Sequence, residues 1–322
     1  MIKTSVITII LLLLPTYTFA QSNDDPYDQR MALYQKYEAI TNIPWYYLAA
    51  IDQYERNIQK EPISEGVISI TIPIEKWNGH GNPNDHDTLS AEEAILFDGI
   101  GQDGDGDGLA DRSNDEDILY TMANWIYQFG TTKQDVKIAL WNYYERDLSV
   151  QSIMFTAKVY ETFRSISLED RIFPVPLQHN YSYRSTWGDP RGFGGRRIHE
   201  GTDIFANYGV PVRSTTYGVI EMKGWNRYGG WRIGIRDINN TYHYLAHLNG
   251  FEKGVSVGQV VKPGDVIGYV GATGYGPPGT SGKFPPHLHY GLYKDNGYSQ
   301  YSFDPYPALR KWERLTQQQI DK

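Results

Sequence analysis

The chain has 322 residues, of which 40% are hydrophobic and 21% are charged, and it contains no cysteine. This is the composition of an ordinary globular protein, and the lack of cysteine excludes disulfide bonds, thiolate nucleophiles and cysteine-type zinc sites. Residues 21–165 carry 25 acidic and 11 basic residues, a net of −14, whereas residues 166–322 carry 13 acidic and 18 basic residues, a net of +5. This asymmetry supports a domain boundary near residue 165. Since no basic cluster or reading motif is present, we expect no nucleic-acid partner.

The first twenty residues predict a secretory signal peptide, residues 1–20. Lys3 supplies a positive start, an apolar run extends from Val6 to Pro15, and small residues precede a cleavage point after Ala20. The alternative is an uncleaved anchor, but the apolar run is short for a bilayer. We therefore expect export across the cytoplasmic membrane and no stable membrane insertion after cleavage.

Residues 21–165 predict an acidic, helical first domain. Apolar residues recur there at intervals of three and four, which is the period of one helix face. Residues 66–74 alternate instead and predict a short extended piece. The predicted helices cover residues 26–40, 44–57, 115–129, 133–146 and 150–164.

An acidic, glycine-rich segment in this domain predicts a calcium loop, because alternate carboxylates on a tight turn converge on one hard cation. The candidate ligands are Asp103, Asp105, Asp107 and Asp111. The twelfth position is Asn114 and not Glu, so the closing ligand is missing or comes from Glu116 or Asp117. The alternative is a solvated acidic turn that caps the following helix.

The stretch from Pro44 to Glu55 contains a Leu-Ala-Ala-Ile run before the glutamate and resembles the first catalytic helix of lysozyme-like lytic transglycosylases. The resemblance implies a lysozyme-like domain in which Glu55 protonates a glycosidic oxygen. That family's usual serine is Arg56 here, and an adjacent cation would favour the ionised carboxylate. We therefore favour a degenerate, glycan-recognising or structural domain over an active one.

Residues 179–310 predict a mainly antiparallel β-sheet, because short β-type runs alternate with glycine-rich turns. Residues 166–178 contain two prolines and predict a linker, and residues 311–322 predict a C-terminal tail. The predicted fold class of the whole chain is therefore α+β.

Five of the eight histidines fall between His199 and His289. His287 and His289 share one face of a strand, because side chains on a strand repeat with a period of two. Asp203 follows His199 in a loop that enters a strand. Two histidines and one carboxylate are a known ligand set for catalytic zinc. A single such histidine is more often structural, but this grouping favours a metal site.

His243 lies four residues before His247 on one predicted strand. The two side chains should therefore share a face, and His243 either supports the metal site or packs in the core.

The motifs around these histidines resemble those of the lysostaphin-type zinc metallopeptidases of peptidoglycan, over roughly residues 185–307. The resemblance implies zinc ligands at His199, Asp203 and His289 and catalytic histidines at His247 and His287. The motifs are His-Glu-Gly-Thr-Asp from 199, Tyr-Leu-Ala-His-Leu from 244, Val-Gly-Gln-Val-Val-Lys-Pro-Gly from 257, Gly-Ala-Thr-Gly from 271 and Pro-His-Leu-His from 286.

The whole chain looks most like the sporulation-type L-Ala–D-Glu endopeptidases of spore-forming bacteria, on its acidic first half and the stretches 187–191 and 279–286. That resemblance implies a secreted enzyme with one Zn²⁺ that cuts peptidoglycan peptide stems in the cell wall or the forespore cortex compartment. Glycyl–glycine and D-Ala–diaminopimelate bonds remain alternatives. So do a non-catalytic wall-binding or activator protein on the same scaffold, and a bifunctional enzyme that also cleaves glycan through Glu55.

Overall fold

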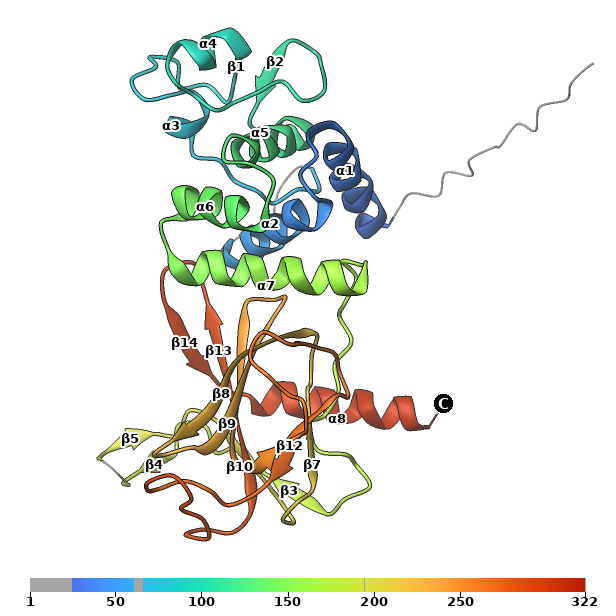
Figure 1. Cartoon of the computed structure of the whole chain (residues 1–322), viewed down its shortest axis with the longest axis vertical. Coiled ribbons are helices and arrows are strands. Elements are labelled where there is room, and N and C mark those ends of the chain that lie inside the picture. The colour runs from blue at the N-terminus through green and yellow to red at the C-terminus, as the bar shows by residue number, and fades with distance from the viewer. Residues whose placement is uncertain (1–24, 61–65, 194, 322) are drawn as a thin grey trace, which may run out of the picture.

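The computed structural model describes residues 25–60, 66–193 and 195–321, so the predicted signal peptide lies outside the described residues. Figure 1 shows an elongated molecule with helices at one end and a β-sheet at the other. Across the described ranges, no helix is both long and apolar enough to cross a membrane. The elements are α1 (Pro26–Thr41), α2 (Trp45–Ile58), α3 (Ile74–Trp77), β1 (Thr88–Ser90), α4 (Ala91–Leu96), β2 (Leu109–Asp111), α5 (Asp115–Tyr127), α6 (Lys133–Tyr144), α7 (Asp147–Phe163), β3 (Tyr181–Tyr183), β4 (Pro190–Arg191), β5 (Arg197–Ile198), β6 (Thr202–Ala206), β7 (Pro211–Arg213), β8 (Gly218–Asn226), β9 (Gly230–Asp237), β10 (Thr241–Phe251), β11 (Val260–Val261), β12 (Val266–Val270), β13 (His287–Asp295), β14 (Gln300–Phe303) and α8 (Tyr306–Ile320).

Five helices make up most of the part near the N-terminus, and they lie where apolar spacing predicts helices. The ends of α1, α2, α5, α6 and α7 are within three residues of the predicted ends. Thr132 and Asp135 form a reciprocal capping box at the start of α6, and the Asn114 side chain caps α5. The apolar faces of these helices meet in one core, which includes Leu48 and Leu119.

The alternating segment before α3 is extended but pairs with no strand among the described residues. Ile68, Ile70 and Ile72 are buried in the helical core. The backbone N–H groups of Val67 and Ile68 donate to the Asp115 carboxylate, over 2.8 and 3.0 Å. The side chain of the first residue of α5 therefore takes the place of a neighbouring strand in satisfying these donors.

The second part is built on one antiparallel sheet with the strand order β11–β8–β9–β10–β13–β6–β3. β14 pairs with β13, and β12 pairs with both β10 and β7. This confirms the antiparallel sheet that the sequence predicts. The central strands β6, β13 and β10 carry four of the five candidate site residues, so sheet register fixes how these residues face one another.

The segments predicted to be a linker and a tail are parts of the core. Phe173 and Val175, in the predicted linker, are fully buried under the sheet. The backbone N–H of Phe173 donates to Thr316 Oγ1 over 2.8 Å, and Trp312 is also buried. The predicted tail after residue 310 is therefore wrong, since this segment continues α8, whose apolar face covers the sheet.

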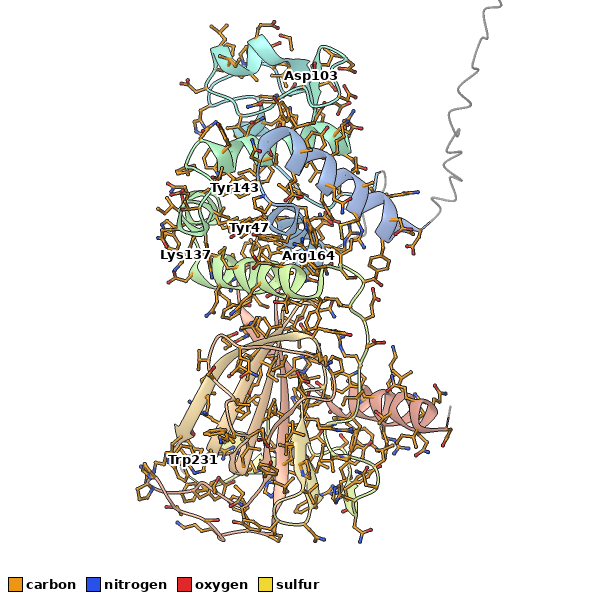
Figure 2. All side chains as sticks on the ribbon, turned by 45° about the vertical axis from the view of Figure 1, so that its right-hand side comes forward. Tyr47, Asp103, Lys137, Tyr143, Arg164 and Trp231 are labelled. Carbon is orange, nitrogen blue, oxygen red and sulfur yellow. The ribbon has the colours of Figure 1, made fainter. Side chains whose placement is uncertain are left out.

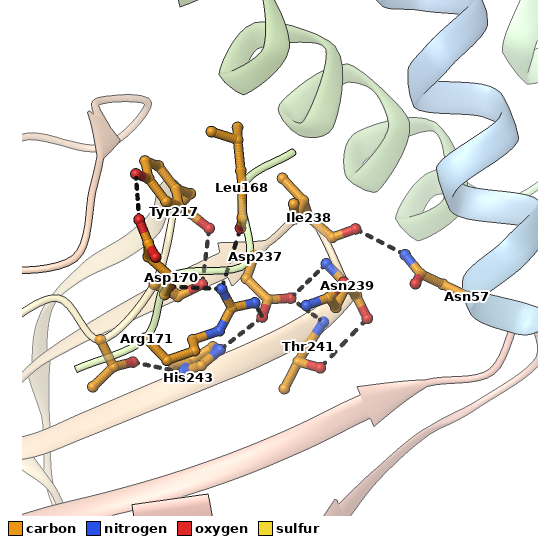
Figure 3. Close-up of polar contacts among 12 residues, drawn as sticks. Asn57, Leu168, Asp170, Arg171, Tyr217, Asp237, Ile238, Asn239, Thr241 and His243 are labelled. Atoms are coloured by element: carbon orange, nitrogen blue, oxygen red, sulfur yellow. Dashed lines mark hydrogen bonds and ion pairs between the residues drawn. The ribbon is translucent and has the colours of Figure 1, made fainter. Parts of the chain in front are cut away.

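Helix α7 lies between the other helices and the sheet (Figure 1). Val219 and Ile238 of the sheet part belong to the same apolar cluster as the helices. Arg146 forms a two-pronged ion pair with the fully buried Asp295 at the end of β13, over 2.8 and 2.8 Å. The Asn57 side chain also donates to the Ile238 carbonyl over 2.8 Å (Figure 3). The two parts are therefore joined by continuous packing.

Candidate metal centre

Three of the predicted site residues bring their ligand atoms together at one end of the sheet. β6 and β13 place Asp203 directly opposite His289, and the turn before β6 carries His199. His199 Nε2 lies 2.9 Å from His289 Nδ1 and 3.1 Å from Asp203 Oδ1. His289 Nδ1 lies 3.2 Å from the same carboxylate oxygen. All three atoms therefore converge on one point.

This triangle fits a single divalent ion. A tetrahedral metal with bonds of about 2.0–2.1 Å holds its ligand atoms about 3.3–3.4 Å apart. The three separations, 2.9, 3.1 and 3.2 Å, are close to that spacing. Among the described residues, the same three side chains form a group able to hold a metal ion. One ion can thus bind all three without a rearrangement of the backbone.

Two further contacts orient the ligands. His199 Nδ1 donates to the Thr186 carbonyl over 2.8 Å, which leaves the lone pair of the neutral ring on Nε2. Arg191 Nη2 donates to Asp203 Oδ2 over 2.7 Å and leaves Oδ1 facing the histidines. Burial raises the pKa of Asp203, but the contacts with the His199 and His289 rings outweigh it and hold that pKa far below its usual range. Asp203 is therefore a carboxylate at any working pH.

The contact of Arg191 is not predictable from the sequence. Arg191 occurs in a motif that carries the family resemblance, but no spacing rule assigns it a partner. β4 and β5 form a two-stranded ribbon outside the main sheet, and that ribbon brings Arg191 to Asp203.

Gly201, between His199 and Asp203, lies against the ring of His289. A Cβ atom at position 201 would be 2.5 Å from His289 Cε1 and 2.7 Å from Nε2. No other residue type fits there without displacing a candidate ligand. The glycine in this motif is therefore explained by close packing and not by a special backbone angle.

His247 reaches the site through a break in the strand ladder. The register between β10 and β9 shifts between Leu245 and Leu248, and His247 has a left-handed φ of 62°. Its N–H donates to the Gly229 carbonyl over 2.7 Å. A β-bulge redirects a side chain in this way, and a left-handed non-glycine residue inside a strand is typical of functional sites.

His287 and His247 lie beside the triangle, with a ring-centroid distance of 4.8 Å. His287 Nδ1 donates to the Pro285 carbonyl over 2.9 Å, and His247 Nδ1 donates to the Thr273 carbonyl over 2.7 Å. Both rings therefore carry the lone pair on Nε2 when neutral. Burial, together with nearby His287 and His289, lowers the pKa of His247 to about 3, and burial also lowers the pKa of His287. Both are neutral imidazoles at pH 7, able to accept a proton.

His243 does not share the face of His247, so that expectation is wrong. The bulge reverses the alternation, and His243 points into the core on the opposite side of the sheet. It is buried, with Nε2 3.1 Å from Asp237 Oδ2 and Nδ1 2.6 Å from the Tyr290 hydroxyl. Figure 3 shows it beside Asp237, which also pairs with Arg171. The packing alternative describes His243.

A cavity of about 770 Å³ opens beside the cluster. Its floor is the groove face of β10 and β13, where Tyr244 lies next to His289, and Tyr242 and Tyr293 pair farther along the same strands. Aromatic residues from the loops form one wall. The cationic lining consists of Arg191, Arg197 and Arg232, and the acidic lining of Glu200 and Asp203. The cavity can therefore take an extended peptide segment that carries negative charge.

The predicted calcium ligands do not all converge. Among the described residues, Asp103 and Asp105 group with Asp117 of α5. Asp107 caps the N–H of Leu109 instead, and Asp111 accepts hydrogen bonds from Ser113. Asp107 and Asp111 therefore lie outside this group, while Asp117 matches one of the two closing ligands considered, and calcium binding stays a prediction. Figure 2 shows Asp103 at the end of the molecule farthest from the sheet.

Glu55 is buried in the helical part, 7% exposed, and accepts a hydrogen bond from the Tyr144 hydroxyl over 2.7 Å. Burial raises its pKa to about 7. Arg56 does not face it: the guanidinium lies 3.2 Å from Asp52 and donates to the Val67 carbonyl. The expectation that Arg56 keeps Glu55 ionised is therefore wrong, because successive helix residues point in different directions.

Comparison with known proteins adds to this geometry. The signature of Peptidase family M23 matches residues 197–301. The chain is 59% identical over 317 residues to the L-Ala–D-Glu endopeptidase of Bacillus subtilis (strain 168), covering 96% of this chain and 97% of that protein. It is 34% identical over 135 residues to lysostaphin of Staphylococcus staphylolyticus, covering 41% of this chain and 26% of that one. Among solved structures, the catalytic domain of lysostaphin from Staphylococcus simulans has 32% identity and a TM-score of 0.33, covering 41% of this chain and 92% of that one.

Proposed function

Because this chain belongs to peptidase family M23, we propose that it is a secreted, zinc-dependent endopeptidase that hydrolyses the L-Ala–D-Glu bond of peptidoglycan stem peptides. The observation that carries the proposal is the triangle of His199, Asp203 and His289 with two neutral imidazoles beside it in an open cavity. The bond assignment is supported by the 59% identity, over nearly the whole chain, to a protein named for that bond.

The ligand set favours zinc over harder cations. Two imidazole nitrogens and one carboxylate suit zinc, whereas calcium and magnesium prefer oxygen ligands throughout. His199, Asp203 and His289 would hold the ion, with Thr186 and Arg191 fixing two of them from behind. When bound, zinc supplies a nucleophile at neutral pH and polarises the scissile carbonyl.

The side chains around the triangle perform the proton transfers. His247 and His287 each present an Nε2 lone pair, because their Nδ1–H groups are held by backbone carbonyls. One of them takes a proton from the attacking water on its Nε2, and the imidazolium so formed returns that proton to the leaving amine. Phe284 packs against both rings and Tyr275 against His247, which limits the access of bulk water.

The strained backbone at His247 disfavours the alternative of a non-catalytic wall-binding protein. A protein that only binds the wall has no use for the left-handed His247 or for a glycine that admits the His289 ring. Backbone strain of this kind costs about 1–3 kcal/mol, and it persists where a function requires it.

Digestion of purified muropeptides tests the proposal. Wild-type protein should release stems with a new amino terminus on D-Glu, identified by mass spectrometry. His199→Ala should lose both bound zinc and this product, whereas His86→Ala, an exposed histidine in the helical part, should retain both. Stems that remain intact with fully loaded wild-type protein would refute the endopeptidase and leave the wall-binding alternative.

We propose a supporting and not a glycan-cleaving role for the helical part, including its lysozyme-like segment. Glu55 is packed against Tyr144, and its carboxyl accepts the hydrogen bond from that hydroxyl. Glu55→Gln should leave peptide cleavage intact and produce no change in sugar products. Reducing-end or anhydro-sugar products that vanish in this variant would establish the bifunctional alternative.

We also propose a calcium site at the acidic cluster of the helical part. Asp103, Asp105 and Asp117 would take a calcium ion, which should raise the melting temperature of wild-type protein but not of Asp105→Asn.

Export should yield a mature protein that begins at Gln21, and loss of the gene should leave uncut stems in the spore cortex or the wall. Amino-terminal sequencing and muropeptide profiles measure these two outcomes.

A further inference from the structure

The cavity beside the metal centre holds more positive charge than the chain itself neutralises. Arg191 is paired with Asp203. Arg197 and Arg232 also line the cavity, but neither forms an ion pair with any described residue. The remaining acidic side chain of the lining, Glu200, accepts a hydrogen bond from Tyr293. Three arginines therefore face two carboxylates in this lining, and a negatively charged substrate group would balance the excess cation.

Of Arg197 and Arg232, Arg232 is the better placed to contact a substrate at the metal centre. It lies on β9 opposite the bulge of β10, because Ile233 pairs with Leu245 and Trp231 pairs with Leu248. Neighbouring strands are about 4.8 Å apart, so Arg232 stands one strand away from the backbone of His247.

The guanidinium of Arg232 lies near an aromatic ring that borders the metal centre. Its guanidinium carbon lies 5.8 Å from the ring centre of Tyr244, and that ring lies 5.7 Å from the ring of His289. Its Nε is buried with no hydrogen-bond partner. A buried donor without a partner is costly, which favours a ligand that engages this half-buried guanidinium.

The chemistry of the proposed bond supplies such a ligand. Glutamate has two carboxyl groups, and only one of them continues the peptide chain. The D-Glu residue therefore keeps a free carboxylate close to the nitrogen that leaves when its bond to L-Ala is cut. A guanidinium matches a carboxylate with two parallel hydrogen bonds, a geometry that lysine lacks.

We propose that Arg232 binds the free carboxylate of the substrate's D-Glu residue and thereby sets the preference for an acidic residue on the amine side of the scissile bond. Arg197, exposed at the rim and 5.6 Å from the ring centre of Tyr228, adds to the positive field at the entrance. This assignment rests on the proposed function, because it takes the L-Ala–D-Glu bond as the site of cleavage.

A pair of synthetic stem peptides tests the assignment. One contains L-Ala–D-Glu with its free carboxylate, and the other has that carboxyl converted to the amide. Wild-type protein loaded with zinc should cleave the acid about 10- to 100-fold faster than the amide in kcat/KM, as expected for a charge-assisted hydrogen bond. Arg232→Gln should reduce kcat/KM for the acid to the level of the amide and leave the amide rate unchanged. Arg232→Lys should fall between the two.

The matched control is Arg227→Gln, an exposed arginine in the turn between β8 and β9 that does not line the cavity and should keep the wild-type preference. Zinc content and melting temperature establish that each variant is folded. Equal loss of both substrates in Arg232→Gln, or equal cleavage of the two peptides by wild-type protein, would overturn the assignment alone. If wild-type protein cleaves neither peptide, the proposed function fails, and the role of Arg232 fails with it.

Discussion

Replacement of Gly201 by alanine tests whether the close approach of the His289 ring positions the metal ligands. The added methyl carbon would lie 2.5 Å from His289 Cε1 and 2.7 Å from the Tyr290 carbonyl oxygen, whereas ordinary contacts begin at 3.4 Å. The ring must therefore retreat by about 0.9 Å, since the backbone oxygen blocks the other direction. Metal–ligand distances tolerate only about 0.2 Å, so His289 can no longer share an ion with its partners.

We expect Gly201→Ala to bind zinc more weakly and to lose about 100-fold in kcat/KM, the usual cost of a shift near 1 Å in a reacting site. Competition with a chromogenic chelator measures the zinc affinity, and release of new amino termini from muropeptides measures the activity. Gly250→Ala is the matched control, because a methyl group there has no atom within 4 Å. Wild-type zinc affinity and activity in Gly201→Ala would refute the packing argument.

Three further predictions concern other parts of the molecule. The pKa of Glu55 rises from 4.5 to about 7 on folding, so the native state holds more protons than the unfolded state between these values. Stability should therefore decrease by about 3 kcal/mol as the pH rises through this window, and urea titrations of Glu55→Gln should show no such decrease. Arg191→Met should weaken zinc binding about 10- to 100-fold while leaving the melting temperature close to wild type, because Arg191 orients Asp203 without filling the core. An unchanged zinc affinity would contradict this. Arg146→Ala should lower the free energy of unfolding by about 3 kcal/mol, because it leaves the buried Asp295 without its cation; a loss below 1 kcal/mol would show that the pair contributes little.

The sequence predicts well those elements in which side chains of one kind recur at a regular short interval. The spacing of three and four places α5 and α6, because each helix buries one apolar stripe against the others. The same reasoning places His287 and His289 on one face of a strand, and both do border the cavity.

The features that sequence reasoning missed depend on contacts between distant segments. Nothing local marks the bulge that turns His247 into the cavity and His243 away from it. Arg191 reaches Asp203 through a ribbon outside the main sheet. In α8, Trp312 packs on His243, a contact between two segments far apart in the sequence.

The sharing of one apolar interior by helices and sheet has a consequence for how the molecule behaves as a whole. Val219 and Ile238 of the sheet part pack among residues of the helices, so the apolar core of the helices is incomplete without the sheet part. Cleavage of the chain at residue 165 would therefore expose apolar surface on both fragments. Heating should accordingly give a single calorimetric transition, and exchange of the front half for another module would require a new set of side chains on the underside of α7.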